Sequence, residues 1–286
     1  MPALVTPYTA TGEVNETSLR SLVSRCLEKG VSGFYACGSS AEAFMLTTAE
    51  RKRILEVVAD ENAGRVALIA HVGAVGTDQS IELGLHAKSV GVDAVSSVPP
   101  FYYSFTQDEV VGHYLAIVEA VEMPLILYNF PAYSGFTVTP ELVNRLRRKS
   151  PHFIGIKQTS SDLYELEQMV AIAEDFFVLS GRDEVLAGAL ALGADGAIGS
   201  TFNLIPEFYV QMMDAFAKGE TEKARQLQVR VNRFIGLMKN GTGLPQLKAG
   251  LDLVGIECNG CRKPIQALAP DELQSIKQTL SDIGVI

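Results

Sequence analysis

The sequence lacks several features that would assign the protein to a class at once. Its formal net charge is −9, and it contains no run of more than three consecutive lysine or arginine residues. A nucleic-acid-binding surface, which needs a basic footprint, is therefore not expected. No apolar stretch approaches the roughly 20 uncharged residues of a membrane span. The start, MPALVTPYTA, also lacks the basic region of a signal peptide. We expect a soluble cytoplasmic protein whose partners are small molecules, with neither nucleic acid nor membrane among them.

Cysteine and histidine are also scarce. Of four cysteines, only Cys258 and Cys261 form a C-x-x-C pair. One such pair is at most half a zinc site, and it lacks the thioredoxin-like setting of a redox pair. The four histidines are scattered, and no H-E-x-x-H occurs. We therefore expect no catalytic metal, and we interpret the cysteine pair and His71 as structural.

What the sequence does contain is a regular alternation of two patterns. Hydrophobic residues make up 47% of the 286 positions, which is sufficient for a large buried core. Short β-branched runs alternate with amphipathic helical patterns, which is typical of βαβ units around a parallel sheet. Eight strands are expected, at residues 3–8, 33–38, 66–73, 93–100, 124–131, 153–159, 176–181 and 196–201.

Eight strands alternating with helices predict an α/β protein with the TIM (β/α)8 barrel fold. The alternative, an open doubly wound sheet, would require a G-x-G-x-x-G fingerprint after an early strand, and none occurs there. After residue 201 only helical patterns follow. We therefore predict a barrel over residues 1–217 and a C-terminal helical extension packed on it over residues 218–286.

Polar residues occur where the predicted strands end. Lys157 lies late in the apolar run FIGIKQT, and Tyr128 lies near the end of the preceding strand. In barrel enzymes the active site is built at the carboxyl ends of the strands. The other polar or small residues at strand ends are Ser39, Ser40, Asn129, Thr159, Gly181, Asp183, Glu184, Ser200 and Thr201.

Each of these residues also has a structural interpretation. Lys157 could reach water through its flexible stem, and the serines and acidic residues could cap turns and helices. Together they offer an amine in an apolar pocket, a phenol that can move protons, and hydroxyls that can hold an anion. Because an apolar pocket favours the neutral amine, the combination predicts Schiff-base chemistry on a keto acid.

The motifs also resemble a known family over nearly the whole chain. The segments are ALVTPY, GSSAEAFMLT, PPFYY, LYNFPAYSG, GIKQTSSDLYELEQ, LSGRDE and GADGAIGSTFN, in this order. They are similar to those of the pyruvate-dependent class I aldolases, the family that includes N-acetylneuraminate lyase and dihydrodipicolinate synthase. The resemblance implies a homotetrameric enzyme that needs neither a metal nor an organic cofactor.

The resemblance also implies roles for individual residues. Lys157 matches the Schiff-base lysine, Tyr128 the proton-shuttling tyrosine, and Ser39 with Ser40 the pair that holds the pyruvate carboxylate. Tyr102 or Tyr103 of a neighbouring subunit is expected to close the site. The positions that match contacts to the sugar portion are Thr159, Gly181, Asp183, Glu184 and Ser200.

Three departures from the family pattern bear on the substrate. Tyr133 stands where the synthases usually carry an arginine, which favours cleavage of N-acetylneuraminate to N-acetylmannosamine and pyruvate. Ala41 replaces the usual glycine and narrows the backbone angles available there. Arg182 is unexpected beside the sugar contacts, where it could bind a carboxylate or pair on the surface. The alternatives are an aldolase for 2-keto-3-deoxy sugar acids, a dihydrodipicolinate synthase, and a non-catalytic ligand-sensing barrel.

Overall fold

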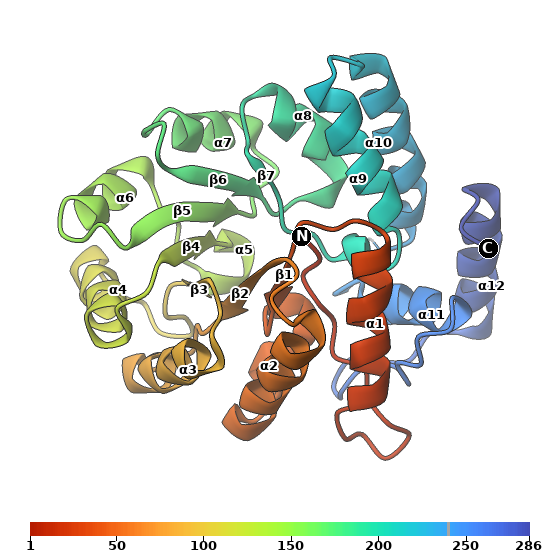
Figure 1. Ribbon diagram of the computed structural model, residues 1–286, viewed down its shortest axis with the longest axis horizontal. Coiled ribbons are helices and arrows are strands. Elements are labelled where there is room, and N and C mark those ends of the chain that lie inside the picture. The colour runs from red at the N-terminus through yellow and green to blue at the C-terminus, as the bar shows by residue number, and fades with distance from the viewer. Residues whose placement is uncertain (239–240) are drawn as a thin grey trace. The chain divides into compact units, whose positions relative to one another are not determined.

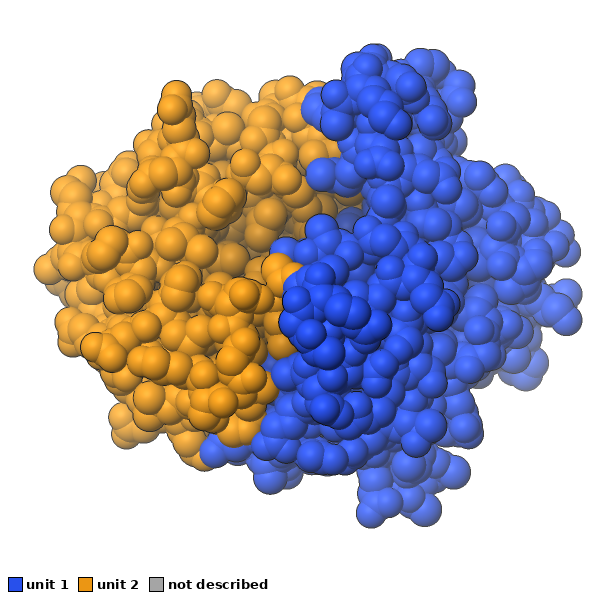
Figure 2. All heavy atoms as spheres, viewed as in Figure 1, with its two compact units in different colours: residues 1–66, 199–286 blue, residues 67–198 orange. Residues whose placement is uncertain are grey.

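Alternating strands and helices organise the middle of the chain, as the sequence predicts. A computed structural model describes residues 1–238 and 241–286. The chain divides into unit 1, residues 1–66 with 199–286, and unit 2, residues 67–198 (Figure 2). Each unit is described by itself.

Unit 2 contains six parallel strands that pair with one another in chain order. They are β2 (Ala67–His71), β3 (Ala94–Ser97), β4 (Leu125–Asn129), β5 (Phe153–Gln158), β6 (Phe177–Ser180) and β7 (Gly196–Ala197). All five residues of β4 are buried. A strand covered on both faces is expected to read as a continuous apolar run, and LILYN does so until its last residue.

Helices of unit 2 follow the strands. They are α3 (Thr77–Val90), α4 (Gln107–Val121), α5 (Pro131–Ser134), α6 (Pro140–Arg147), α7 (Leu163–Val170) and α8 (Leu186–Ala191), with the 3₁₀ helix η3 (Asp183–Val185). Thr106 begins α4 with a capping box that it forms with Glu109, an arrangement that satisfies free N–H groups at the helix start. Figure 1 shows α3, α4, α6, α7 and α8 along the outer side of the curved row of strands.

Unit 1 is mainly helical. Its helices are α1 (Glu16–Glu28), α2 (Thr48–Asn62), α9 (Pro206–Ala217), α10 (Thr221–Ile235), α11 (Leu244–Leu253) and α12 (Pro270–Asp282). Its strand is β1 (Gly33–Ala36), and its 3₁₀ helices are η1 (Ser39–Ala41), η2 (Ala43–Met45), η4 (Thr201–Asn203) and η5 (Gly236–Met238). Helix α1 packs on α2, α9 on α10, and α11 on α12. The helical pattern that was predicted after residue 201 is therefore confirmed.

Seven of the eight predicted strands are found, with shorter bounds. The prediction of a continuous strand over residues 3–8 is wrong. Pro2 and Ala3 form single parallel bridges to Gly199 and Tyr35. The ladder ends after Leu4, because the Val5 N–H donates to the Asn203 side chain at 3.2 Å instead of to a strand. A side-chain acceptor that competes for a backbone N–H interrupts regular pairing.

Candidate active site

Lys157 and Tyr128 lie side by side in unit 2. Lys157 is on β5 and Tyr128 on β4, and the two residues are directly paired in the parallel register. The Lys157 Nζ atom lies 4.1 Å from the centre of the Tyr128 ring. Both side chains are buried, with 4% and 2% of their surfaces exposed. The strand pairing thus places a primary amine and a phenol within one buried neighbourhood, as the sequence predicts.

Aromatic rings surround Tyr128. The His71 ring meets it edge-on at 5.7 Å between centroids, and the Phe130 ring is stacked at 5.9 Å. Tyr133 stacks in turn on Phe130 at 4.3 Å. The Nε2 atom of His71 accepts the Val98 N–H at 3.4 Å, a contact consistent with the structural role that was predicted for this histidine.

An amide pair joins the ends of β4 and β5. Asn129 Nδ2 donates to Gln158 Oε1 at 2.9 Å, and Asn129 Oδ1 accepts the Val138 N–H at 3.0 Å. Both side chains are buried. The pair fixes the strand ends that carry Tyr128 and Lys157. Sequence reasoning gave Gln158 no role, although its place beside the lysine in the strand was an available signal.

Thr159 and Gly181 meet at the ends of β5 and β6. The Thr159 N–H donates to the Asn129 carbonyl, and the Gly181 N–H to the Gln158 carbonyl, each at 2.8 Å. A Cβ atom at position 181 would collide with Oγ1 of Thr159, so glycine is required for this close approach. Thr159 is 5% exposed, and its Oγ1 has no hydrogen-bond partner among the described residues. Such a hydroxyl is available to a ligand.

Arg182, Asp183 and Glu184 follow directly. Asp183 is buried, whereas Arg182 and Glu184 are partly exposed and their Nη1 and Oε1 atoms lie 3.6 Å apart. The Arg182 guanidinium also lies 5.7 Å from the centre of the Phe130 ring. Arg182, unexpected from the sequence, therefore already contacts an acidic partner and an aromatic face.

The predicted carboxylate-binding serines lie in unit 1. Ser39 and Ser40 occupy the 3₁₀ turn η1, which follows β1. The left-handed conformation in this turn falls on Glu42, with φ at 59°, and not on Ala41. Ala41 can therefore replace the family's usual glycine without a strained backbone. Ser200 also lies in unit 1, before η4, and its carbonyl accepts Nδ2 of Asn203 at 2.7 Å.

The structure thus brings the predicted residues together in two groups. Lys157, Tyr128, Thr159 and the residues 181–184 are neighbours in unit 2. Ser39 and Ser40 share one turn of unit 1. That both groups serve one active site stays a prediction.

Tyr102 and Tyr103 lie in the loop before α4. They are 86% and 66% exposed, and their rings meet edge-on at 5.0 Å. Exposed aromatic side chains of this kind are common where a protein meets a partner. A contribution of these tyrosines to a neighbouring subunit stays a prediction.

Cys258 and Cys261 do not have the low thiol pKa of reactive cysteines. All four cysteines are free thiols, and burial raises the pKa of both Cys258 and Cys261 to about 12. Thiols with such pKa values are poor nucleophiles.

In the described residues, no group of three or more His, Cys, Asp or Glu side chains could hold a metal ion. Within the same residues, no helix is both long and apolar enough to span a membrane.

Comparison with known proteins places this geometry in context. Residues 1–283 match the model of the dihydrodipicolinate synthetase family. An N-acetylneuraminate lyase of Citrobacter koseri is 41% identical over 281 residues, which cover 97% of this chain and 94% of the relative. Another N-acetylneuraminate lyase, from Rhizobium meliloti, is 38% identical over 98% of this chain and 93% of the relative.

Solved structures agree with the sequence comparison. The structure of CdNal from Clostridium difficile in complex with mannosamine is 32% identical, has a TM-score of 0.94, and covers 99% of this chain and 97% of that one. A dihydrodipicolinate synthase structure is 30% identical with a TM-score of 0.94, over 100% of this chain and 98% of that one. The predicted fold class, a TIM barrel with C-terminal helices, is confirmed by these likenesses.

Proposed function

Because the chain belongs to the dihydrodipicolinate synthetase family, we propose that it is a carbon–carbon lyase that cleaves N-acetylneuraminate to N-acetylmannosamine and pyruvate. The observation that carries the proposal is the buried Lys157 amine, 4.1 Å from the ring centre of Tyr128 on the neighbouring strand. Covalent catalysis on a keto acid needs such a nucleophile beside a group that can move a proton.

The reaction begins at the keto carbon of the substrate. The neutral Lys157 amine adds to this carbon, and loss of water leaves an iminium that accepts electrons. Tyr128 helps to remove the proton from the C4 hydroxyl, and the C3–C4 bond breaks. The aldehyde sugar leaves, and the bonding electrons form an enamine on the lysine. C3 then takes up a proton, and water hydrolyses the iminium to release pyruvate.

Binding residues complete the proposal. Ser39 and Ser40 hold the carboxylate of the keto acid through hydroxyl and backbone N–H donors. The sugar chain is bound by Thr159, Gly181, Asp183, Glu184 and Ser200. The Oγ1 of Thr159 has no hydrogen-bond partner among residues 1–238 and 241–286, which supports this assignment, because a buried hydroxyl of this kind gains most from a polar ligand.

The nature of the aldehyde follows from two residues. A synthase needs a cation for the carboxylate of its second substrate, and Tyr133 supplies none. Arg182 is a cation close to Tyr133's neighbour Phe130, but it already lies 3.6 Å from Glu184 and over the Phe130 ring. The curated relatives at 38–41% identity are named N-acetylneuraminate lyases, which also supports a sugar aldehyde. The runner-up is an aldolase for 2-keto-3-deoxy sugar acids, in which Arg182 would bind the acid.

The proposal extends to the state of the protein in the cell. We place the enzyme in the cytoplasm as a homotetramer, with Tyr102 or Tyr103 of a neighbouring subunit at the site. It uses the lysine adduct in place of a metal or an organic cofactor. A non-catalytic sensing barrel is the alternative from another class, and the paired amine and phenol argue against it.

An assay of pyruvate release tests the substrate. N-acetylneuraminate, 2-keto-3-deoxygluconate and 2-keto-3-deoxygalactonate are compared, alongside condensation of pyruvate with aspartate semialdehyde. We expect the highest kcat/KM with N-acetylneuraminate, because a site built to hydrogen-bond hydroxyls rejects analogues that lack them. A higher value for either deoxy sugar acid, or condensation alone, would overturn the sialic acid assignment and leave the Schiff-base mechanism standing.

A further inference from the structure

A buried ion pair involves Glu42, the residue that directly follows the turn with Ser39 and Ser40. Lys248 on α11 places its Nζ 2.5 Å from Oε1 of Glu42, and both side chains are completely buried. The same Nζ donates to the Gly260 carbonyl at 2.8 Å and lies 4.2 Å from the centre of the Tyr8 ring. The mechanism proposed above uses none of these groups.

Glu42 is the point where the turn changes direction. It lies between η1 and η2 with φ at 59°, and its N–H donates to the Ser39 carbonyl at 3.1 Å. Its second carboxylate oxygen accepts the Arg262 N–H at 2.7 Å. A non-glycine residue keeps a left-handed conformation only when its surroundings hold it there. Here the carboxylate is held by both Lys248 and the backbone of Arg262.

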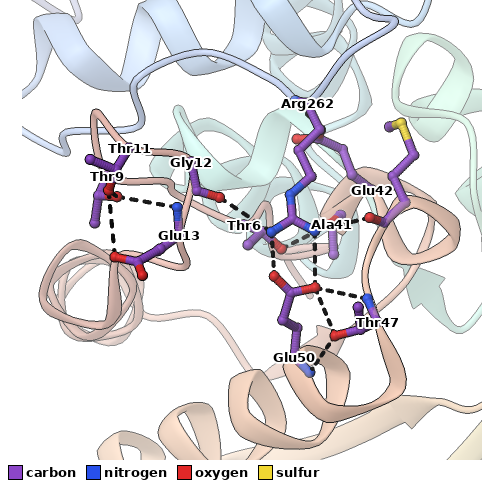
Figure 3. Close-up of polar contacts among 11 residues, drawn as sticks. Thr6, Thr9, Thr11, Gly12, Glu13, Ala41, Glu42, Thr47, Glu50 and Arg262 are labelled. Atoms are coloured by element: carbon purple, nitrogen blue, oxygen red, sulfur yellow. Dashed lines mark hydrogen bonds and ion pairs between the residues drawn. The ribbon is translucent and has the colours of Figure 1, made fainter.

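Arg262 contacts the segment 42–50, which follows the serine turn, through its backbone and its guanidinium (Figure 3). Its Nη1 donates to the Met45 carbonyl and to Oε2 of Glu50, each at 2.9 Å. Its Nη2 donates to the Gly12 carbonyl at 3.2 Å. The Arg262 guanidinium lowers the pKa of Glu50 to about 2. Arg262 therefore contacts both Glu42, which follows η1, and Met45, the last residue of η2.

The polar character of this contact points to positioning. A buried ion pair loses much of its attraction to the desolvation of both charges, and an apolar pair of equal volume often gives equal stability. A paired carboxylate, however, accepts hydrogen bonds only along defined directions, which an apolar contact would not impose. The pair therefore orients the backbone of Glu42, and through it the Ser39 carbonyl.

We infer that Glu42, Lys248 and Arg262 are positioning residues that hold the Ser39–Ala41 turn in the geometry that binds the carboxylate of the keto acid. The inference rests on the proposed function, because that proposal assigns the carboxylate to Ser39 and Ser40. Its consequence is that the C-terminal part of unit 1 controls affinity for pyruvate without contacting it.

Pyruvate alone, trapped on the protein with borohydride, provides the test. The pyruvate concentration that gives half-maximal trapping reports affinity, and the extent of trapping at saturation reports the amount of competent protein. For Glu42→Gln and Lys248→Met we expect the half-maximal concentration to rise roughly 10- to 100-fold, as displaced binding groups do elsewhere. The extent at saturation should remain that of the wild-type protein.

A matched control is Glu16→Gln, which breaks the exposed ion pair with Arg53 in the same unit. We expect wild-type values for both quantities. If Glu42→Gln or Lys248→Met fails to fold, Arg262→Ala serves instead, because it removes the guanidinium contacts and keeps the N–H that Glu42 accepts. It should raise the half-maximal concentration in the same direction.

Two outcomes would overturn the inference. In one, the folded variants, Arg262→Ala included, trap pyruvate with the wild-type half-maximal concentration. In the other, only the extent of trapping falls, as expected when the contacts merely stabilise the fold. Failure of the Schiff-base mechanism, the part of the proposed function on which the inference rests, looks different, since the wild-type protein would then form no pyruvate adduct at all.

Discussion

The two units each bury a lysine, and the two lysines have different neighbours. Lys248 in unit 1 is completely buried and lies 2.5 Å from a carboxylate. Lys157 in unit 2 is 4% exposed, and its Nζ lies over the face of the Tyr128 ring at 4.1 Å. Each amine also lies about equally close to a tyrosine ring, because Tyr8 is 4.2 Å from Lys248. What characterises Lys248 is therefore its ion pair with Glu42.

We propose that Lys248 is a structural lysine and that Lys157 is the reactive one. A carboxylate at contact distance stabilises the ammonium form, which has no lone pair with which to attack a carbonyl. A ring face attracts a cation only modestly and cannot take its proton. On this proposal burial alone does not make a lysine a nucleophile, and the ion pair with Glu42 gives Lys248 a structural role.

Exchanging the two lysines for methionine should break the comparison most clearly. Lys157→Met removes the nucleophile, so no pyruvate adduct should be trapped and activity should fall by at least about 10³-fold. Lys248→Met leaves Glu42 buried without its partner, which should lower the free energy of unfolding by about 3–5 kcal/mol. At saturating pyruvate this second variant should still form the adduct at Lys157. Peptide mapping after borohydride reduction checks both expectations, and a label on Lys248 would reverse the assignment.

The two tyrosines beside these lysines sharpen the same contrast. Tyr128→Phe should keep adduct formation but slow carbon–carbon cleavage by about 10²- to 10⁴-fold, as the loss of a positioned acid–base group does. Tyr8→Phe is the matched control, because the Tyr8 hydroxyl is buried and has no hydrogen-bond partner within residues 1–238 and 241–286. Removal of the Tyr8 hydroxyl should leave the rate of carbon–carbon cleavage at the wild-type value. Single-turnover cleavage rates of both variants decide, and a rate for Tyr128→Phe within twofold of wild type would exclude the proposed role.

Much of the fold could be predicted from local patterns. Strands such as LILYN and FIGIKQ read as apolar runs because both of their faces are covered. The segment 3–8, ALVTPY, also begins as an apolar run, but Asn203, 198 positions away, takes the N–H of Val5. No local pattern encodes that competition. The division into a barrel over residues 1–217 and an extension over 218–286 stays a prediction.

The candidate site was predictable to a similar extent. Lys157 and Tyr128 come at the ends of consecutive strands, so the parallel topology alone brings them together. The Glu42–Lys248 pair joins residues 206 positions apart, and neither residue lies at the end of a predicted strand. A lysine on the apolar face of the helix LPQLKAGLDL was the one available signal. It indicates burial but does not identify the acidic partner.

Another buried basic group, His113, shows the effect of burial itself. It lies on α4, is 4% exposed, and its Nδ1 lies 2.9 Å from Oγ1 of Thr77. Its Nε2 is buried and has no hydrogen-bond partner in the described part of the chain. Burial lowers its pKa from 6.5 to about 4. His113 is therefore neutral in the folded protein at neutral pH, unlike a group held in an ion pair.

This shift makes the stability of the protein depend on pH in a defined window. Between pH 6.5 and about 4 the unfolded chain binds a proton at His113 that the folded chain does not bind, so acidification favours unfolding. The stability that comes from keeping His113 neutral is complete above pH 6.5. It is lost as the pH falls toward 4, by up to about 3 kcal/mol.

His113→Gln preserves a polar partner for Thr77 but cannot titrate, so its stability should fall less steeply over this window. Urea unfolding at pH 7, 5.5 and 4.5 measures the slopes of the wild-type protein and of His113→Gln. Equal slopes for wild type and His113→Gln would mean that His113 accepts its proton in the folded state, and that burial without a carboxylate does not suffice to keep a basic group neutral in this protein.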